Sequence, residues 1–331
     1  MGAPNCVIGF DMGGTKMLAS VLDHSYQAIS TAKKRTPPGA DNEKVLDVVV
    51  ATVGAALDEA GIKPGDVAAI GIAVPGPIDR EAGRIVSLTN VGVHDMPLRD
   101  QLSAEFGIPV VLDNDVNAGT FGEFVAGAAK GYRNVLGVFP GTGVGGGIII
   151  DGTLYRGHTG RAGEIGHMIV EVGGRLCGCG KYGCLEAVSS RTAIAKELVH
   201  LAAIGEAPTV LERAGTDITQ VKSGVIKKAI GAGEKSVIRV VERAAWYLGV
   251  GLGSCLDIFD PDVVVLGGGL VEKLGDSYLE SVEASMREHN MIGSKAPLVR
   301  ASLGDDSVIV GSAALALSEI HKSPAAESSD A

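Results

Sequence analysis

Aromatic residues are scarce in this sequence and positive charge is in deficit, and both shortages restrict what the protein binds. Only 4% of the 331 residues are aromatic, and the formal net charge is −10. A nucleic-acid-binding surface needs clustered Lys and Arg, and binding to single strands adds aromatic side chains on which bases stack. Anionic lipid also attracts basic rather than acidic segments. The composition therefore predicts a protein that binds neither nucleic acid nor membranes.

Long apolar runs and a targeting signal are missing as well. Nowhere does an apolar run reach the length that a membrane-spanning helix requires. No basic region precedes the first apolar segment, at residues 7–10. The five cysteines are an odd number for a disulfide framework. We therefore expect a cytoplasmic protein whose thiols are reduced.

Glycine, in contrast, is abundant, and its 48 residues gather at the ends of apolar segments rather than in a low-complexity tract. Such glycines are typical of loops that turn sharply or approach a ligand closely. Because 331 residues exceed one compact core, and strands alternate with helical periodicity, the sequence predicts two α/β domains. Helices are expected at residues 42–60, 117–129, 237–259 and 311–322.

Two segments far apart in the chain share one form, which is an apolar strand, a Gly/Thr turn and a second apolar strand. They are "IGFDMGGTKMLASVLD" at residues 8–23 and "LGVFPGTGVGGGIIIDG" at residues 136–152. One interpretation is two domains of similar design, each presenting its turn to a shared cleft. The other is two unrelated hairpins, and the pattern alone leaves both open.

The second turn matches the dinucleotide-binding fingerprint G-x-G-x-x-G at residues 141–146. That fingerprint requires a helix after the turn, so that the pyrophosphate lies on the helix N-terminus. The β-branched residues 148–150 predict a strand instead, which excludes a Rossmann site. The turn can still hold a phosphate, because consecutive backbone N–H groups form an anion-binding nest and Thr142 adds a hydroxyl donor.

The first turn, at residues 13–16, carries one cation but lacks the spacing of a Walker phosphate loop. Asp11 lies just before it, at a strand end, where a carboxylate suits a magnesium ion shared with phosphates. A third glycine turn, at residues 267–269, follows another buried strand. Together the three turns favour a cleft that binds a nucleotide.

Three polar residues, Asp113, Asn114 and Asp115, stand where a buried strand ends and a helix begins. A simple interpretation is that Asp115 caps the helix by accepting hydrogen bonds from its first N–H groups. Capping accounts for one acid but not for the cluster. A helix N-terminus also keeps an acid ionised, which suits a base that accepts a hydroxyl proton during phosphoryl transfer.

Residues 166–187 contain a possible metal site made of His167, Cys177, Cys179 and Cys184. Three cysteines and one histidine form a recognised closed zinc set. The C-x-C pair is tighter than the usual spacing, so the spacing alone leaves zinc and chance composition open. Glycines at positions 178, 180 and 183 favour zinc, because they let a short loop wrap an ion. With four protein ligands the ion would be structural rather than catalytic.

Seven motifs together resemble the ROK sugar kinases, of the sugar kinase/actin/Hsp70-like superfamily, and most resemble the bacterial glucokinases of that family. In chain order they are "DMGGTK", "PGPID", "NDVNAG", "GTGVGGGI", "GEIGH", "CGCGKYGCLE" and "LGGG", and the likeness runs from about residue 6 to 317. The resemblance implies a two-domain, actin-like (ribonuclease H-like) α/β fold with a cleft between the domains. We expect a first domain at residues 1–115 joined by the helix at 311–322, a second at 116–310 carrying the zinc site, and a disordered tail at 323–331.

The resemblance also implies an activity, which is ATP-dependent phosphorylation of a hexose at its 6-hydroxyl, with D-glucose as the first choice and Asp115 as the base. The implied partners of the sugar are Gly76, Asn90, Asn114, Asp115, Glu164, His167 and Glu186. The implied nucleotide-binding residues are Gly13, Gly14, Thr15, Lys16, Thr142, Gly143, Gly267, Gly268 and Gly269. The implied cofactors are a structural Zn²⁺ and Mg²⁺ with ATP, and the implied assembly is a homodimer or homotetramer.

One departure from the family leaves the sugar open. The segment after Asn90 lacks the tryptophan expected there, so fructose, mannose, allose and N-acetylmannosamine remain candidates beside glucose, and ADP or polyphosphate remain candidate donors. A sugar-responsive repressor of the same family is the alternative from another class. Such repressors carry an N-terminal helix-turn-helix domain, whereas the first strand is expected here from residue 7, and the chain is acidic. The sequence therefore favours the enzyme.

Overall fold

The computed structural model describes residues 6–88 and 91–322. It divides into two compact units, Met1–Gly131 with Asp305–Ala331 (unit 1) and Tyr132–Gly304 (unit 2). The boundaries expected from the sequence lay at 115/116 and 310/311, so the helix that follows residue 115 falls in unit 1 rather than in the second domain. The expected tail at 323–331 lies outside the described residues.

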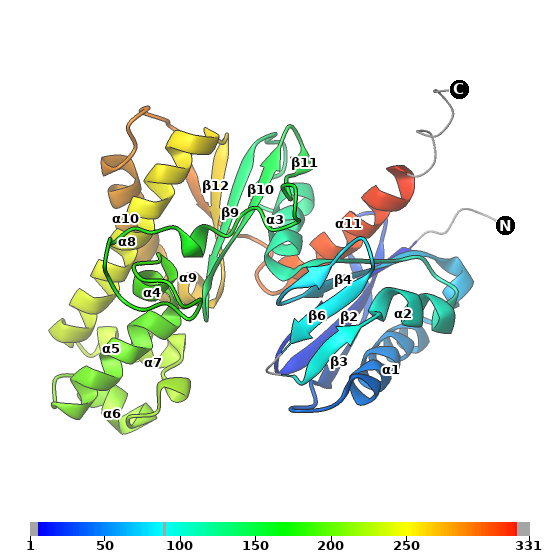
Figure 1. The fold of residues 1–331 in the computed structure, drawn as a ribbon, viewed down its shortest axis with the longest axis horizontal. Helices are drawn as coiled ribbons and strands as arrows, with labels where there is room; N and C mark the ends of the chain where they lie inside the picture. The colour runs from blue at the N-terminus through cyan, green and yellow to red at the C-terminus, as the bar shows by residue number, and fades with distance from the viewer. Residues whose placement is uncertain (1–5, 89–90, 323–331) are drawn as a thin grey trace. The chain divides into compact units, whose positions relative to one another are not determined.

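The sheet of unit 1 has the strand order β3-β2-β1-β4-β8 (Figure 1). β1 pairs antiparallel with β2, and β2 pairs antiparallel with β3. On the other side β1 pairs parallel with β4, and β4 pairs parallel with β8. The bounds are β1 Cys6–Met12, β2 Lys16–Asp23, β3 Ala28–Arg35, β4 Val67–Val74 and β8 Val110–Asn114.

Two helices cover opposite faces of this sheet. Alternate residues of a strand point to opposite sides, so neighbouring residues of one strand contact different helices. A Cβ atom on Gly71 would lie 1.8 Å from the carbonyl oxygen of Ser312, so α11 (Asp306–Lys322) lies backbone to backbone on one face. On the other face apolar side chains of β1 and β4 form a core with α1 (Asn42–Ala60). That core includes Ile8, Phe10, Ile70, Ile72, Val45, Val49 and Val53.

The ends of α1 follow from local chemistry. The side chain of Asp41 accepts a hydrogen bond from the Lys44 N–H, which satisfies one of the first N–H groups of the helix. Gly61 ends the helix in the left-handed conformation, at φ 66°, where glycine has no Cβ clash. The helix expected at residues 42–60 is confirmed.

Unit 1 also contains a small antiparallel sheet in the order β5-β6-β7. Two longer helices complete the unit, and α3 packs against α11. The bounds are η1 Pro64–Asp66, β5 Ile78–Asp79, β6 Arg84–Leu88, β7 Val93–Met96, α2 Leu98–Phe106 and α3 Asp115–Ala126.

The sheet of unit 2 repeats the design of the first, with the strand order β11-β10-β9-β12-β13 (Figure 1). Here β9 pairs antiparallel with β10 and parallel with β12, as β1 does with β2 and β4. The bounds are β9 Val135–Pro140, β10 Val144–Ile150, β11 Thr153–Leu154, β12 Val263–Leu266 and β13 Leu298–Arg300. The two strand–turn–strand segments of the sequence therefore open two sheets of one design, and the interpretation as unrelated hairpins is wrong.

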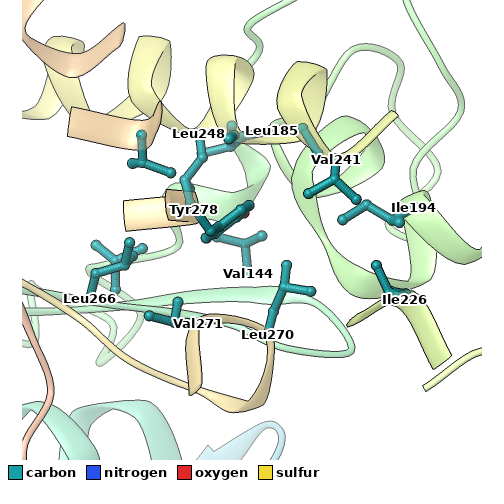
Figure 2. Close-up of a cluster of buried hydrophobic side chains, with 14 of the residues drawn as sticks. Val144, Leu185, Ile194, Ile226, Val241, Leu248, Leu266, Leu270, Val271 and Tyr278 are labelled. Atoms are coloured by element: carbon teal, nitrogen blue, oxygen red, sulfur yellow. The ribbon is translucent and has the colours of Figure 1, made fainter. Parts of the chain in front are cut away.

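Helices pack on this second sheet around a large apolar core. Figure 2 shows part of it, where Val144 of β10, Leu266 of β12, Leu248 of α8 and Tyr278 of α10 gather. The bounds are η2 Ile165–His167, α4 Glu186–Ser189, α5 Arg191–Ala203, α6 Pro208–Ala214, η3 Ile218–Gln220, α7 Ser223–Gly231, α8 Lys235–Phe259, α9 Gly269–Leu274 and α10 Asp276–Glu288. Among the described residues, no helix is both long enough and apolar enough to cross a membrane.

Candidate functional site

Three predicted site residues of unit 1, Asp11, Asn114 and Asp115, lie at one edge of its sheet. Asp11 of β1 and Asp113 of β8 are both in register with Ala73 of the strand between them. Because these three strands are parallel, their carboxyl ends meet at the same edge, where ligands of α/β sheets commonly bind. Asn114 and Asp115 follow Asp113 directly, so the topology brings them toward Asp11.

Burial and charge raise the pKa of both Asp115 and Asp11, and the charge of Asp11 contributes to the shift of Asp115. Burial, helped by the negative charge of Asp11, raises the pKa of the Asp115 carboxyl to about 6. Burial likewise raises the pKa of Asp11 to about 6, although the positive charge of Lys16 acts against it. Desolvation disfavours the charged form of a carboxyl, and a second carboxylate nearby adds to that effect. Both acids are therefore better proton acceptors than ordinary surface aspartates.

The start of α3 is capped by Asn114 rather than by Asp115. The Asn114 Oδ1 accepts hydrogen bonds from the Val116 N–H at 2.8 Å and the Asn117 N–H at 3.2 Å. Asp115 also accepts from the Val116 N–H at 2.9 Å, but it is the first residue of the helix and not its cap. The capping interpretation of Asp115 is thus wrong in the main. Since Asn114 uses its oxygen for the cap, its side-chain amide N–H groups are what it can offer a ligand.

The first glycine turn joins β1 to β2 and contains Gly13, Gly14 and Thr15. A Cβ on Gly13 would lie 2.7 Å from the Lys16 carbonyl oxygen, so the turn requires glycine there. The Lys16 ammonium pairs with Asp305 at 3.0 Å, just before α11. An incoming phosphate would have to compete with this carboxylate for the lysine.

Gly76 also lies near the edge that Asp11 and Asn114 occupy, because Val74, the last residue of β4, is in register with Asn114. Its φ of +150° and a Cβ position 2.9 Å from Leu88 Cδ2 explain why glycine stands there. Asn90, the other residue expected near it, lies outside the described residues.

In unit 2 the second and third glycine turns meet at one edge. Pro140 ends β9 and Leu266 ends the parallel strand β12, and the Gly267 N–H donates to the Val138 carbonyl at 2.9 Å. A Cβ on Gly268, whose φ is +86°, would lie 3.0 Å from the Pro140 carbonyl oxygen. The structure therefore brings residues 141–143 and 267–269 together. β10 begins at Val144, so the strand that excluded a dinucleotide fingerprint is confirmed.

Side chains of α5 support the second turn. Arg191 donates through Nη2 to the Thr142 hydroxyl at 2.8 Å, and the Thr192 hydroxyl donates to the Thr142 carbonyl at 2.6 Å. A hollow of about 340 Å³ opens beside this turn, and its lining includes Thr142, Gly143, Cys177, Glu186, Ser190 and Lys196. The predicted phosphate turn, one predicted sugar ligand and one predicted metal ligand thus share one hollow.

Glu186 is held by this turn through a contact that the sequence does not reveal. Its Oε2 accepts a hydrogen bond from the Val144 N–H at 3.1 Å. A Cβ on Gly143 would lie 2.2 Å from the same oxygen, so only glycine at 143 allows the carboxylate this close. Gly143 was predicted to serve a phosphate, and the structure shows that it also makes room for Glu186.

Glu164 and His167 belong to a segment that lies tightly on β10. A Cβ on Gly166 would lie 2.1 Å from the Val144 carbonyl oxygen, and one on Gly163 would lie 2.5 Å from the Gly146 carbonyl oxygen. Motifs alone do not explain these glycines, and the motif around Gly146 indicates only a phosphate-binding turn. They let the short helix η2 approach the strand and so fix the positions of both predicted sugar ligands.

The His/Cys cluster has the geometry of a closed metal site. The ligand atoms of His167, Cys177, Cys179 and Cys184 lie within 4.8 Å of one another. The Cys179 and Cys184 sulfur atoms are 3.7 Å apart, and the Cys177 sulfur is 3.8 Å from His167 Nδ1. Two thiolates on one tetrahedral zinc ion, each about 2.3 Å from it, would stand about 3.8 Å apart. The donor set and its spacing therefore fit zinc.

His167 presents its two ring nitrogens to different neighbours. Nδ1 faces the cysteines, while Nε2 lies 3.9 Å from Glu164 Oε2. Metal-bound histidines usually place their second nitrogen against a carboxylate or another acceptor, which fixes the ring. The arrangement links the cluster to Glu164, an exposed carboxylate that a ligand can reach.

Comparison with known proteins assigns this combination of turns, carboxylates and cysteines to one family. The model of the ROK family matches residues 7–319. The chain belongs to the ROK family. The glucokinase of Streptomyces coelicolor is 34% identical over 315 residues, which cover 93% of this chain and 96% of that protein.

A solved structure supports the fold of the whole chain. It is that of a ROK family glucokinase from Streptomyces griseus in complex with glucose and AMPPNP, with a TM-score of 0.80 and 33% identity, and the match covers 95% of this chain and 99% of that one. The two-domain, actin-like fold expected from the sequence is thereby confirmed.

Repressors are related to this chain as well. The xylose repressor of Bacillus subtilis is 30% identical over 312 residues, which cover 94% of this chain and 76% of that protein. Membership of the ROK family therefore includes proteins of two functional classes. The choice between them rests on the chemistry of the site.

Proposed function

We propose that this ROK protein is an ATP-dependent hexose kinase that transfers a phosphoryl group to the 6-hydroxyl of D-glucose. The observation that carries the proposal is the state of Asp115, a partly buried carboxylate at a helix start whose pKa is raised to about 6. A base works best when its pKa lies near the working pH, because it is then both ionised and able to hold a proton. A residue that only shaped a sugar-sensing site would not need this property.

The proposed reaction uses Asp115 as the general base. The sugar O6 attacks the γ-phosphorus of ATP, the bond from that phosphorus to the β–γ bridging oxygen breaks, and the hydroxyl proton passes to the Asp115 carboxylate. ADP leaves with the electrons of the broken bond. Phosphoryl transfer depends mainly on positioning and on charge stabilisation, so the backbone N–H groups and Thr142 of the glycine turns are proposed to hold the phosphates.

The remaining sugar hydroxyls are proposed to bind Asn114, Glu164, His167 and Glu186. A pyranose presents neutral donors and acceptors, which carboxylates and amides read by paired hydrogen bonds. A site of this kind rejects sugars that lack a hydroxyl, because its own polar groups would stay unpaired. Asn90 and Gly76 are proposed to contribute to the frame of the sugar.

Two metal ions belong to the proposal. A zinc ion would be held by His167, Cys177, Cys179 and Cys184, and with four protein ligands it would brace the segment that carries Glu164 and Glu186. A magnesium ion would accompany ATP and neutralise phosphate charge, with Asp11 as its proposed protein contact. The raised pKa of Asp11 fits this role, because a nearby cation would stabilise its charged form.

A coupled assay tests the proposal directly. Glucose, mannose, fructose, allose and N-acetylmannosamine are each assayed with ATP, ADP and polyphosphate, and Asp115→Asn serves as the inactive control. We expect turnover of glucose with ATP, and a loss of about 10²–10⁴-fold in kcat for Asp115→Asn, the range attributed to general base catalysis. Turnover of another hexose in place of glucose would correct the substrate and keep the reaction.

The similarity to xylose repressors supplies the alternative, a sugar-binding protein without turnover. This alternative would be favoured if the wild-type protein bound a sugar in calorimetry but phosphorylated none of the sugars with any donor. Equal turnover by wild type and Asp115→Asn would instead refute the base assignment while leaving a kinase.

A further inference from the structure

Asp113 lies directly before Asn114 and Asp115 and is almost completely buried, with 4% of its side chain exposed. Its Oδ1 accepts hydrogen bonds from the Asn114 N–H at 2.9 Å and from the Asn117 side-chain amide at 3.0 Å. One carboxylate thus holds both ends of residues 114–117, the stretch that contains Asp115. In the sequence Asp113 belongs to a polar cluster with Asn114 and Asp115, and the pattern predicts no separate role for it.

A charged side chain from another element faces Asp113. Arg80 Nε lies 3.5 Å from Asp113 Oδ2, and Arg80 Nη2 lies 2.6 Å from Glu319 Oε1. Arg80 follows β5 at the end of the "PGPID" motif, while Glu319 belongs to α11. A buried carboxylate costs free energy unless a counter-charge and hydrogen bonds compensate it. Arg80 supplies that charge and connects the segment after β5 to β8 and α11.

We propose that Arg80 and Asp113 are positioning residues, which hold the Asp115 carboxylate in place without touching the substrate. The inference rests on the proposed role of Asp115 as the base. Arg80 fixes the carboxylate of Asp113, and Asp113 fixes the backbone on which Asp115 stands. Catalysis depends steeply on such placement, since a shift of about 1 Å can cost about 100-fold in rate.

Steady-state kinetics of Arg80→Ala, Arg80→Lys and Asp113→Asn test this role, with Arg84→Ala as the matched control. Arg84 is the first residue of β6, which pairs with β5, and its side chain pairs with the exposed Asp95, so its loss removes an equal charge away from Asp113. We expect Arg80→Ala and Asp113→Asn to lower kcat about 10- to 100-fold while the sugar KM changes little, and Arg80→Lys to recover part of the loss. Arg84→Ala should keep the wild-type kcat.

A double mutant shows whether Arg80 acts through Asp113. If it does, Arg80→Ala should cost much less in the Asp113→Asn background than in the wild type, because the two changes remove one interaction. Fully additive losses would overturn the inference. So would a normal kcat in a variant whose melting temperature has dropped, since that pattern belongs to a purely structural ion pair.

Amide hydrogen exchange gives a readout that does not need turnover. The N–H groups of Val116 and Asn117 are hydrogen-bonded to Asn114, so they report on the start of α3. We expect them to exchange faster in Arg80→Ala and Asp113→Asn than in Arg84→Ala. Unchanged exchange would refute the positioning role, even if the wild type proved to be no kinase. Faster exchange in Arg80→Ala and Asp113→Asn, combined with a wild type that shows no turnover, would refute only the proposed function.

Discussion

Gly311 of α11 lies directly against the backbone of Ala118 in α3. A Cβ atom on Gly311 would stand 1.7 Å from the Ala118 carbonyl oxygen, and one on Gly122 would stand 2.0 Å from the Ser307 carbonyl oxygen. Two helices separated by most of the chain therefore touch through their backbones. Since α3 begins at Asp115, this contact also anchors the helix that carries the proposed base.

Gly311→Ala is expected to destabilise the protein, because the new methyl group has no space. Overpacking of this kind costs about 1–3 kcal/mol and sometimes more. The control is Gly54→Ala in α1, where a Cβ meets nothing within 4 Å. Removing a helical glycine there should stabilise the protein by about 0.5–1 kcal/mol. Urea unfolding of both variants measures the difference, and a Gly311→Ala variant as stable as wild type would contradict the contact.

The same contact explains which part of the fold could be predicted. Alternating strands, the two Gly/Thr hairpins and the helix at 42–60 follow from patterns within a few residues of each other. The side of the domain boundary on which α3 falls depends instead on how Gly311 meets Ala118, residues remote in sequence. A contact between residues so far apart leaves no local pattern in the sequence. The boundary predicted at 115/116 therefore differs from the observed division at 131/132.

The candidate site shows the same limit. Glu186 and Gly143 could be predicted as site residues, because each lies in a motif that resembles the ROK family. They did not reveal that Glu186 binds the Val144 N–H or that Gly143 leaves the space for it. A glycine in a motif suggests that a larger side chain does not fit at that position. Only the folded structure shows which atom a Cβ would collide with.

Zinc binding is the second prediction. Purified protein should carry about one zinc ion per chain, and Cys184→Ser should lose it, because structural sites need all four ligands. Cys255→Ala is the control, since Cys255 is buried in α8 and takes no part in the cluster. Elemental analysis of the two variants decides the point. Metal-free wild-type protein with full stability would refute a structural zinc.

Removing the metal should weaken sugar binding before it weakens nucleotide binding. His167 faces the cysteines with Nδ1 and Glu164 with Nε2, so loss of the ion frees a ring that stands beside a proposed sugar ligand. Titration calorimetry of chelated protein with glucose, and separately with a non-hydrolysable ATP analogue, measures both affinities. Equal losses would indicate that the ion braces the whole of unit 2 rather than the segment around Glu164.

Tyr278 offers a test of the core of unit 2. It is buried among apolar side chains (Figure 2), and within the described residues its hydroxyl has no hydrogen-bond partner. A buried unpaired polar group costs about 1–3 kcal/mol, so Tyr278→Phe should increase the free energy of unfolding. Tyr247→Phe is the opposite control, because the Tyr247 hydroxyl donates to Glu171 at 3.0 Å. If both variants lost stability equally, the Tyr278 hydroxyl would have a partner after all.

The pH dependence of activity follows from the raised pKa of Asp115. The base must be ionised, so kcat/KM should fall as the pH drops through about 6. Asp11 contributes to that value through its negative charge, and Asp11→Asn removes the charge. The acid limb of the profile should therefore move to lower pH in this variant, whatever its maximal rate. A limb that stays in place would show that burial alone sets the pKa of Asp115.

Stability should respond to the same group in the opposite sense to catalysis. The pKa of Asp115 is raised in the folded protein from 3.8 to about 6, so the fold favours the protonated form. The stability that this preference contributes is present below the unfolded value and is lost as the pH rises through about 6. Asp115→Asn mimics the protonated form and keeps that stability.

At pH 8 Asp115→Asn should therefore be more stable than wild type by about 1–3 kcal/mol, and at pH 4.5 by about a third of that difference. Asp47→Asn, on the exposed side of α1, controls for the loss of one negative charge. Denaturant unfolding at the two pH values measures the effect. A variant that is inactive and also less stable than wild type at pH 8 would mean that the ionised carboxylate stabilises the fold, which would contradict the burial that makes Asp115 a base.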